Sequence, residues 1–159
     1  MKIIDILNEN LVKTNLIGNT KEEIINEMID LLISSNASTK ILDKEKVRSC
    51  IFEREKIMST GVGNGFAIPH GKTDAVSDII AAFGITGKPI DYQSLDEKPV
   101  RLVFLLVARD NMVGPHIKLL SRISRLMNKE EFRQRLLNLS NPAEVIEAFK
   151  TEESSYFDI

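Results

Sequence analysis

The segment that most constrains the fold is residues 100–107, which is almost continuously apolar. A strand that is covered on both faces gives such a run, because neither row of its side chains meets water. Residues 79–86 predict a second strand, and residues 11–17 and 66–70 predict two shorter extended segments. We therefore expect a β-sheet with residues 100–107 in a central position.

Helical patterns precede and follow these strands. Thr20 with Glu23 forms a capping box ahead of an amphipathic stretch, and a second helix is expected from about 43 to 58. Three further helix starts are expected at Gly114-Pro115, at Asn128 with Glu131, and at Asn141-Pro142. Strands between helices indicate an α/β layered domain, although sheet order and strand direction do not follow from the pattern.

Size and charge limit the classes of partner. The 159 residues suit one domain, which we place at residues 1–150, followed by a C-terminal tail at 151–159. A net charge of −2 gives no general attraction to nucleic acid or anionic membrane. The longest apolar run, 102–108, is far shorter than the roughly 20 residues of a membrane span, and the N-terminus lacks a signal-peptide pattern. We expect a cytoplasmic protein without direct membrane insertion.

His70 is the first candidate for chemistry. It follows the glycine-rich stretch 61–65 and Pro69, so its backbone is held while its ring can be open to solvent. A neutral imidazole is a nitrogen nucleophile near physiological pH and can hold a phosphoryl group as a labile N–P bond. A turn histidine without a role is the alternative that position alone leaves open.

Arg54 is the second candidate. It falls at helical spacing on the stripe that carries Val47, Cys50, Ile51 and Met58. An arginine on a core-facing stripe needs an anionic partner, because an unpaired buried charge is costly. That partner is either a carboxylate of the chain or a phosphoryl group, whose oxygens suit the planar guanidinium.

His116 is the third candidate and lies in the first turn of the helix expected after Gly114-Pro115. It shares a face with Leu119, Leu120 and Ile123, which favours a core histidine. A helix start also offers free N–H groups that attract anions, so membership of an anion site is the other interpretation.

Nucleotide, cofactor and metal sites are not expected. Gly71-Lys72-Thr73 resembles the end of a P-loop, but Phe66 stands where its leading glycine belongs. The glycine-rich stretch lacks the last glycine of the dinucleotide fingerprint and follows a helix rather than a strand. His70 and His116 lack a convincing third metal ligand.

Three segments together resemble a known family. They are REKIMSTGVGNGFAIPHGK at residues 54–72, LDEKPV at 95–100 and HIKLL at 116–120. The first closely resembles the signature of type-2 IIA domains, the fructose/mannitol class of the bacterial phosphoenolpyruvate-dependent sugar phosphotransferase system. The similarity covers nearly the whole chain and is greatest to the fructose branch.

The resemblance implies a fold, an activity and partners. The family fold is an α/β sandwich with a mixed sheet covered by helices on both faces. The family activity is that of a phosphotransferase without a cofactor, in which His70 is phosphorylated and Arg54 and His116 lie beside it. The implied donor is the histidine phosphocarrier protein, and the implied acceptor is a cysteine of a separate IIB component. Cys50 is not expected to be an acceptor, because a thiol on an apolar helix stripe has a raised pKa.

One functional alternative stays open within this resemblance. Nitrogen-type IIA paralogues share much of the same signature, and such a protein acts by binding other proteins according to its phosphorylation state. Phe66, Ala108-Arg109 and Ile117 depart from the usual family pattern. These departures leave the chemistry intact but put the surface that partners recognise in doubt.

Overall fold

In a computed structural model that describes residues 1–157, the apolar segment forms β6, the middle strand of a six-stranded sheet. The strands are β1 (Val12–Leu16), β2 (Gly61–Gly63), β3 (Phe66–Ala67), β4 (His70–Thr73), β5 (Ile80–Ile90) and β6 (Val100–Arg109). The order is β1-β5-β6-β3-β2, and β4 also pairs with β6. The sheet is mixed, because β5 and β6 are antiparallel while β3 and β4 run parallel to β6.

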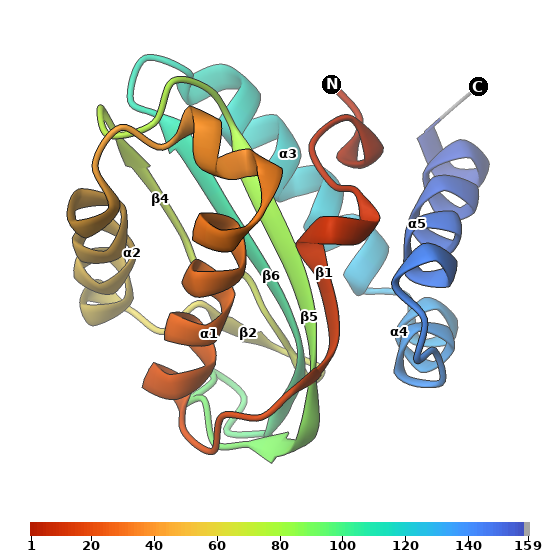
Figure 1. Ribbon diagram of the computed structural model, residues 1–159. Helices are drawn as coiled ribbons and strands as arrows, with labels where there is room; N and C mark the ends of the chain where they lie inside the picture. The colour runs from red at the N-terminus through yellow and green to blue at the C-terminus, as the bar shows by residue number, and fades with distance from the viewer. Residues whose placement is uncertain (158–159) are drawn as a thin grey trace.

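Helices cover both faces of this sheet, as expected. The α-helices are α1 (Lys21–Ser34), α2 (Lys44–Ile57), α3 (Val113–Met127), α4 (Glu130–Leu137) and α5 (Pro142–Phe157). Three short 3₁₀ helices span Ile3–Asp5, Glu9–Leu11 and Asn36–Lys40. Figure 1 shows α1 and α2 on one side of the sheet and α3, α4 and α5 on the other. No helix within residues 1–157 is long and apolar enough to cross a membrane.

The alternation of side chains along β5 and β6 determines which face of the sheet each residue points to. The Phe83 and Phe104 rings lie opposite each other on β5 and β6, and both contact Phe149 of α5, at centroid distances of 5.1 and 5.8 Å. On the other face, a side chain on Gly84 would collide with Leu16 and Met28, so α1 packs directly on the β5 backbone there. Successive strand residues point to opposite faces. Leu106 therefore lies on the α3–α5 face with Phe104, and Val107 lies on the α1–α2 face.

Side-chain caps explain where several helices begin. The Thr20 hydroxyl accepts a hydrogen bond from the Glu23 N–H at 3.2 Å, and the Glu23 carboxylate accepts from the backbone N–H of Asn19. Asp43 caps α2 by accepting from two N–H groups, and Asn141 accepts from the Ala143 N–H before α5. These three starts agree with the sequence pattern.

Other boundaries differ from those expected. Pro115 is the third residue of α3 rather than the first, and Lys129 rather than Asn128 precedes α4, without a side-chain cap. The extended segment after the glycine-rich stretch is interrupted at residues 68–69 and continues past His70 as β4. The boundary expected after residue 150 falls inside α5, where the buried Glu153 accepts hydrogen bonds from the N–H groups of Ile3 and Ile4.

Candidate functional site

All three candidate residues line one open cavity of about 700 Å³ beside β4. His70 enters it from β4, Arg54 from the last turn of α2 and His116 from the first turn of α3. The remaining lining residues are Cys50, Glu53, Lys56, Ile57, Gly71, Lys72, Ile117 and Leu120. The cavity therefore lies where helices from opposite faces of the sheet meet at the β4 edge.

The His70 ring is oriented by its own backbone. Its Nδ1 lies 2.7 Å from the carbonyl oxygen of Ile68. A carbonyl oxygen can only accept a hydrogen bond, so Nδ1 carries the proton and Nε2 keeps a lone pair. The imidazole therefore presents Nε2 with an unshared electron pair.

The charge of His70 is set mainly by burial. Burial lowers the pKa of His70, the hydrogen bond to Ile68 opposes that shift, and the positive charges of Arg54 and Lys72 lower the pKa further. A lowered pKa keeps the ring neutral at physiological pH. Neutrality is what nitrogen nucleophilicity requires, because a protonated imidazole has no free lone pair.

His116 lies next to His70, with 5.7 Å between the ring centroids. His116 as a whole is 3% exposed, and its Nε2 atom has no hydrogen-bond partner among residues 1–157. Burial, with smaller contributions from the His70 and Lys72 charges, lowers the pKa of His116 to about 4. A buried polar atom without a partner is rare in folded proteins. An anion held in the cavity would supply the missing acceptor if Nε2 carries the proton.

Arg54 does not lie on the core-facing stripe, contrary to the sequence prediction. It is half-buried, and its Nη1 donates to the Met58 carbonyl oxygen at 2.9 Å. Met58 is exposed, because α2 ends at Ile57 and the chain turns away there. Within residues 1–157 no carboxylate lies within ion-pairing distance of Arg54. Arg54 instead lines the cavity together with His70.

The neighbouring Glu55 is the charged residue that faces the core. Its carboxylate pairs with Lys21 at 2.7 Å, accepts from the Thr60 N–H at 2.8 Å and from the Thr60 hydroxyl, and lies 3.2 Å from the Tyr92 hydroxyl. Glu55 and Lys21 are both more than 90% buried. This cluster joins the last turn of α2 to the start of β2 and so fixes the point from which Arg54 projects.

Cys50 lines the same cavity on the α2 side. A side chain on Gly71 would collide with the Cys50 sulfur, so the close packing of α2 on β4 requires glycine at residue 71. Burial raises the pKa of the Cys50 thiol to about 11. The expected direction of the pKa shift is confirmed, although Cys50 is half-buried rather than fully buried.

Two charged residues of this region were not identified as site residues from the sequence. Lys72 lines the cavity, and Glu55 anchors the last turn of α2 by its ion pair with Lys21. The sequence pattern ends the extended segment at His70. A strand continued past His70 would have placed Lys72 on the same face as His70, because alternate residues of a strand share a face. Glu55 gave no such signal, because helical spacing near a helix end does not decide between adjacent residues.

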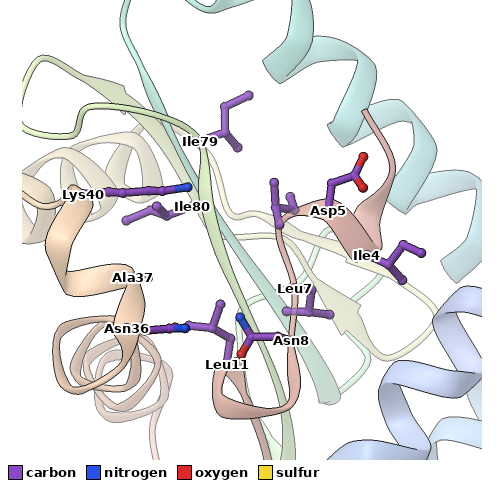
Figure 2. A pocket seen from close by; sticks show the side chains of 11 residues that line it. Ile4, Asp5, Leu7, Asn8, Leu11, Asn36, Ala37, Lys40, Ile79 and Ile80 are labelled. Carbon is purple, nitrogen blue, oxygen red and sulfur yellow. The ribbon is translucent and has the colours of Figure 1, made fainter.

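A second cavity near the N-terminus differs in kind. It has a volume of about 160 Å³ and is lined by the N-terminal segment, by residues 36–40 and by the start of β5 (Figure 2). Its charged side chains are engaged elsewhere, since Asp5 accepts from the Lys2 N–H and Lys40 pairs with Asp78. No group of three or more His, Cys, Asp or Glu side chains that could hold a metal ion occurs within the described residues.

Comparison with known proteins assigns the chain to a family. A family model described as "Phosphoenolpyruvate-dependent sugar phosphotransferase system, EIIA 2" matches residues 5–152. The chain is 37% identical over 147 residues to the fructose-specific EIIABC component of Bacillus subtilis. That match covers 92% of this chain but only 23% of the longer relative.

Nitrogen regulatory proteins are also similar. One from Bradyrhizobium diazoefficiens is 34% identical over 136 residues, covering 86% of each chain. The crystal structure of nitrogen regulatory protein IIA-Ntr from Neisseria meningitidis superposes with a TM-score of 0.84 at 32% identity, covering 92% of this chain and 98% of that one. The chain therefore belongs to the type 2 EIIA family of the phosphoenolpyruvate-dependent sugar phosphotransferase system.

Proposed function

We propose that this chain is a phosphocarrier that accepts a phosphoryl group on Nε2 of His70 and passes it to another protein. The observation that carries the proposal is the fixed tautomer of His70. Nδ1 is committed to the Ile68 carbonyl, which leaves Nε2 with a lone pair in an open cavity. Arg54 and the partnerless Nε2 of His116 are then available to the phosphoryl oxygens.

The chemistry is a pair of displacements at phosphorus. On loading, a bond forms between His70 Nε2 and phosphorus while the N–P bond of a phosphohistidine donor breaks, and its electron pair returns to the donor ring. On unloading, an acceptor thiolate forms the S–P bond and the electron pair of the breaking N–P bond returns to His70 Nε2. Arg54 and His116 donate hydrogen bonds to the equatorial oxygens, over which the negative charge spreads.

The family and the rim of the cavity support a choice of partners. We take the donor to be the histidine phosphocarrier protein and the acceptor to be a cysteine of a IIB component, with fructose as the sugar branch. Ile57 and Ile117, 79% and 59% exposed, line the cavity and suit contact with another protein. Transfer to Cys50 is disfavoured, because its raised pKa leaves little thiolate.

The nitrogen-regulatory class is the second candidate. It is favoured by the 34% identity to the Bradyrhizobium protein and by the superposition on the Neisseria structure. In that case His70 is still phosphorylated, but the product is a change in the affinity for a regulated protein rather than onward transfer.

Labelling separates these functions. We expect phosphoenolpyruvate, the first enzyme of the system and the histidine carrier to label the wild type at one residue, which peptide mapping assigns to His70. His70→Ala should stay unlabelled. Phosphorylated protein mixed with fructose-type IIB components should lose its label to their cysteine, and Cys50→Ser should transfer equally well. Full labelling of His70→Ala would rule out the phosphocarrier function, and retention of label with every IIB protein of the source organism would favour regulation.

A further inference from the structure

Lys72 shares the strand and the face of His70. In the parallel pairing of β4 with β6, His70 lies opposite Leu106, Gly71 opposite Val107 and Lys72 opposite Ala108. Paired residues point to the same face, and successive residues alternate. His70 and Lys72 therefore both point to the face that α3 covers, while Gly71 points toward α2, where it meets Cys50.

The charge of Lys72 is not neutralised within the cavity. Lys72 lines the cavity and is exposed, and within residues 1–157 no carboxylate lies within ion-pairing distance of it. Glu53, which also lines the cavity, pairs with Lys56 at 3.4 Å. Arg54 and Lys72 thus remain as two cations with no acidic counterpart there.

The Lys72 charge reaches both imidazoles. It contributes to the lowered pKa of His70 on β4 and also to that of His116, which lies on α3. Lys72, His70 and His116 all line this one cavity, so the ammonium group and both rings share a space in which Coulomb interactions act over short distances. A phosphoryl group on His70 Nε2 would occupy this same cavity.

We propose that Lys72 is a catalytic residue whose ammonium group binds an oxygen of the phosphoryl group as it moves to and from His70. This inference rests on the proposed phosphocarrier function. No proton moves in the step: Lys72 stays protonated while one N–P bond forms and the other breaks. The flexible lysine stem can follow the phosphorus during the displacement, whereas Arg54 is held by its hydrogen bond to Met58.

The rate of transfer provides the first test. Single-turnover transfer from the phosphorylated histidine carrier is measured against carrier concentration for wild type, Lys72→Met and Lys72→Arg. Lys150→Met is the matched control, because Lys150 is an exposed lysine on α5, which packs beside β1 at the far end of the sheet. Loss of one buried donor typically costs 10²–10³-fold, and solvent screening reduces this at an exposed site. We expect Lys72→Met to lower the maximal rate about tenfold, with Lys72→Arg near wild type and Lys150→Met unchanged.

The phosphoryl group itself provides the second test. Phosphorus NMR of phosphorylated His70 follows the second ionisation of the phosphoryl group with pH. Removing a cation about 5 Å away should raise its midpoint by roughly 0.5 pH unit in Lys72→Met, and Lys150→Met should leave the midpoint unchanged. A purely structural role of Lys72 would not move this midpoint.

The outcomes are distinguishable. A wild-type maximal rate together with an unshifted midpoint in Lys72→Met would overturn the proposal. An increase only in the carrier concentration needed for half-maximal rate would also overturn it, since Lys72 would then serve docking. If wild type takes up no phosphate at His70, the proposed function itself fails and this inference falls with it.

Discussion

At pH 7 both imidazoles of the cavity are neutral, because burial lowers the pKa of His70 and lowers that of His116 to about 4. The two rings differ in what their nitrogens do. His70 has one nitrogen committed to a carbonyl and the other free, whereas His116 has a buried Nε2 without a partner. The first arrangement suits a nucleophile and the second suits a hydrogen-bond donor to an anion.

The buried His116 should make stability depend on pH. Its pKa in the folded state lies below the usual 6.5, so the unfolded chain binds the proton more tightly. The free energy of unfolding is therefore fully maintained above pH 6.5 and falls as the pH drops toward 4, by up to about 3 kcal/mol. Urea unfolding of the unphosphorylated protein between pH 7 and 4.5 measures this loss.

His116→Gln is the variant that isolates this residue, since it keeps a polar side chain but cannot titrate. Protonation of carboxylates with lowered pKa values, such as Asp78, lowers the free energy of unfolding in acid in both proteins. The free energy of unfolding should therefore fall further with decreasing pH in the wild type than in His116→Gln. Parallel profiles would show that His116 is protonated equally readily in the folded and unfolded states.

At the scale of elements, the position of Arg54 depends on how α2 ends. The Glu55 carboxylate holds the last turn through Lys21 of α1, Thr60 before β2, and Tyr92 in the loop after β5. The pKa of Tyr92 is well above its usual value, because its hydroxyl is buried beside Glu55. An interaction set of this kind orients the helix end more firmly than the exposed pair of Glu53 and Lys56 can.

Breaking this cluster from one side should destabilise the fold. Glu55→Gln leaves the Lys21 ammonium buried without its counter-charge, and we expect a loss of about 3 kcal/mol in the free energy of unfolding. Lys21→Met leaves the Glu55 carboxylate buried without its counter-charge and should lower the free energy of unfolding by a similar amount. The double variant should lose clearly less than the sum of the two, as a double-mutant cycle in urea would measure. Strict additivity would contradict the coupling.

For the whole molecule, the sequence predicted the layers better than the edges. The central strand follows from a long apolar run and the helices follow from caps and periodicity, whereas helices on both faces are what the family resemblance implies. The placement of His70 and His116 beside each other was implied by the family signature, and the structure places their rings 5.7 Å apart. The order of strands and the pairing of β4 with β6 are long-range features that no local pattern encodes.

The sequence predictions fail at the end of α2 and along the short strand β4. Arg54 and Glu55 are adjacent at a helix end, and only tertiary contacts decide that Glu55 turns inward. The sequence offers Lys72 only within the rejected P-loop pattern Gly71-Lys72-Thr73, and β4, four residues long, is too short for its alternation to place Lys72. Both charges help to shape the electrostatics around His70, because Glu55 raises its pKa and Lys72 lowers it.

The measurement that tests the central claim most directly is the identity of the phosphorylated nitrogen. Nitrogen-15 NMR of protein labelled at histidine, after loading by the histidine carrier, distinguishes phosphate on Nε2 from phosphate on Nδ1. We predict phosphate on His70 Nε2, with the Nδ1 proton retained by the Ile68 carbonyl. Phosphate on Nδ1 of His70, or on His116, would contradict the account.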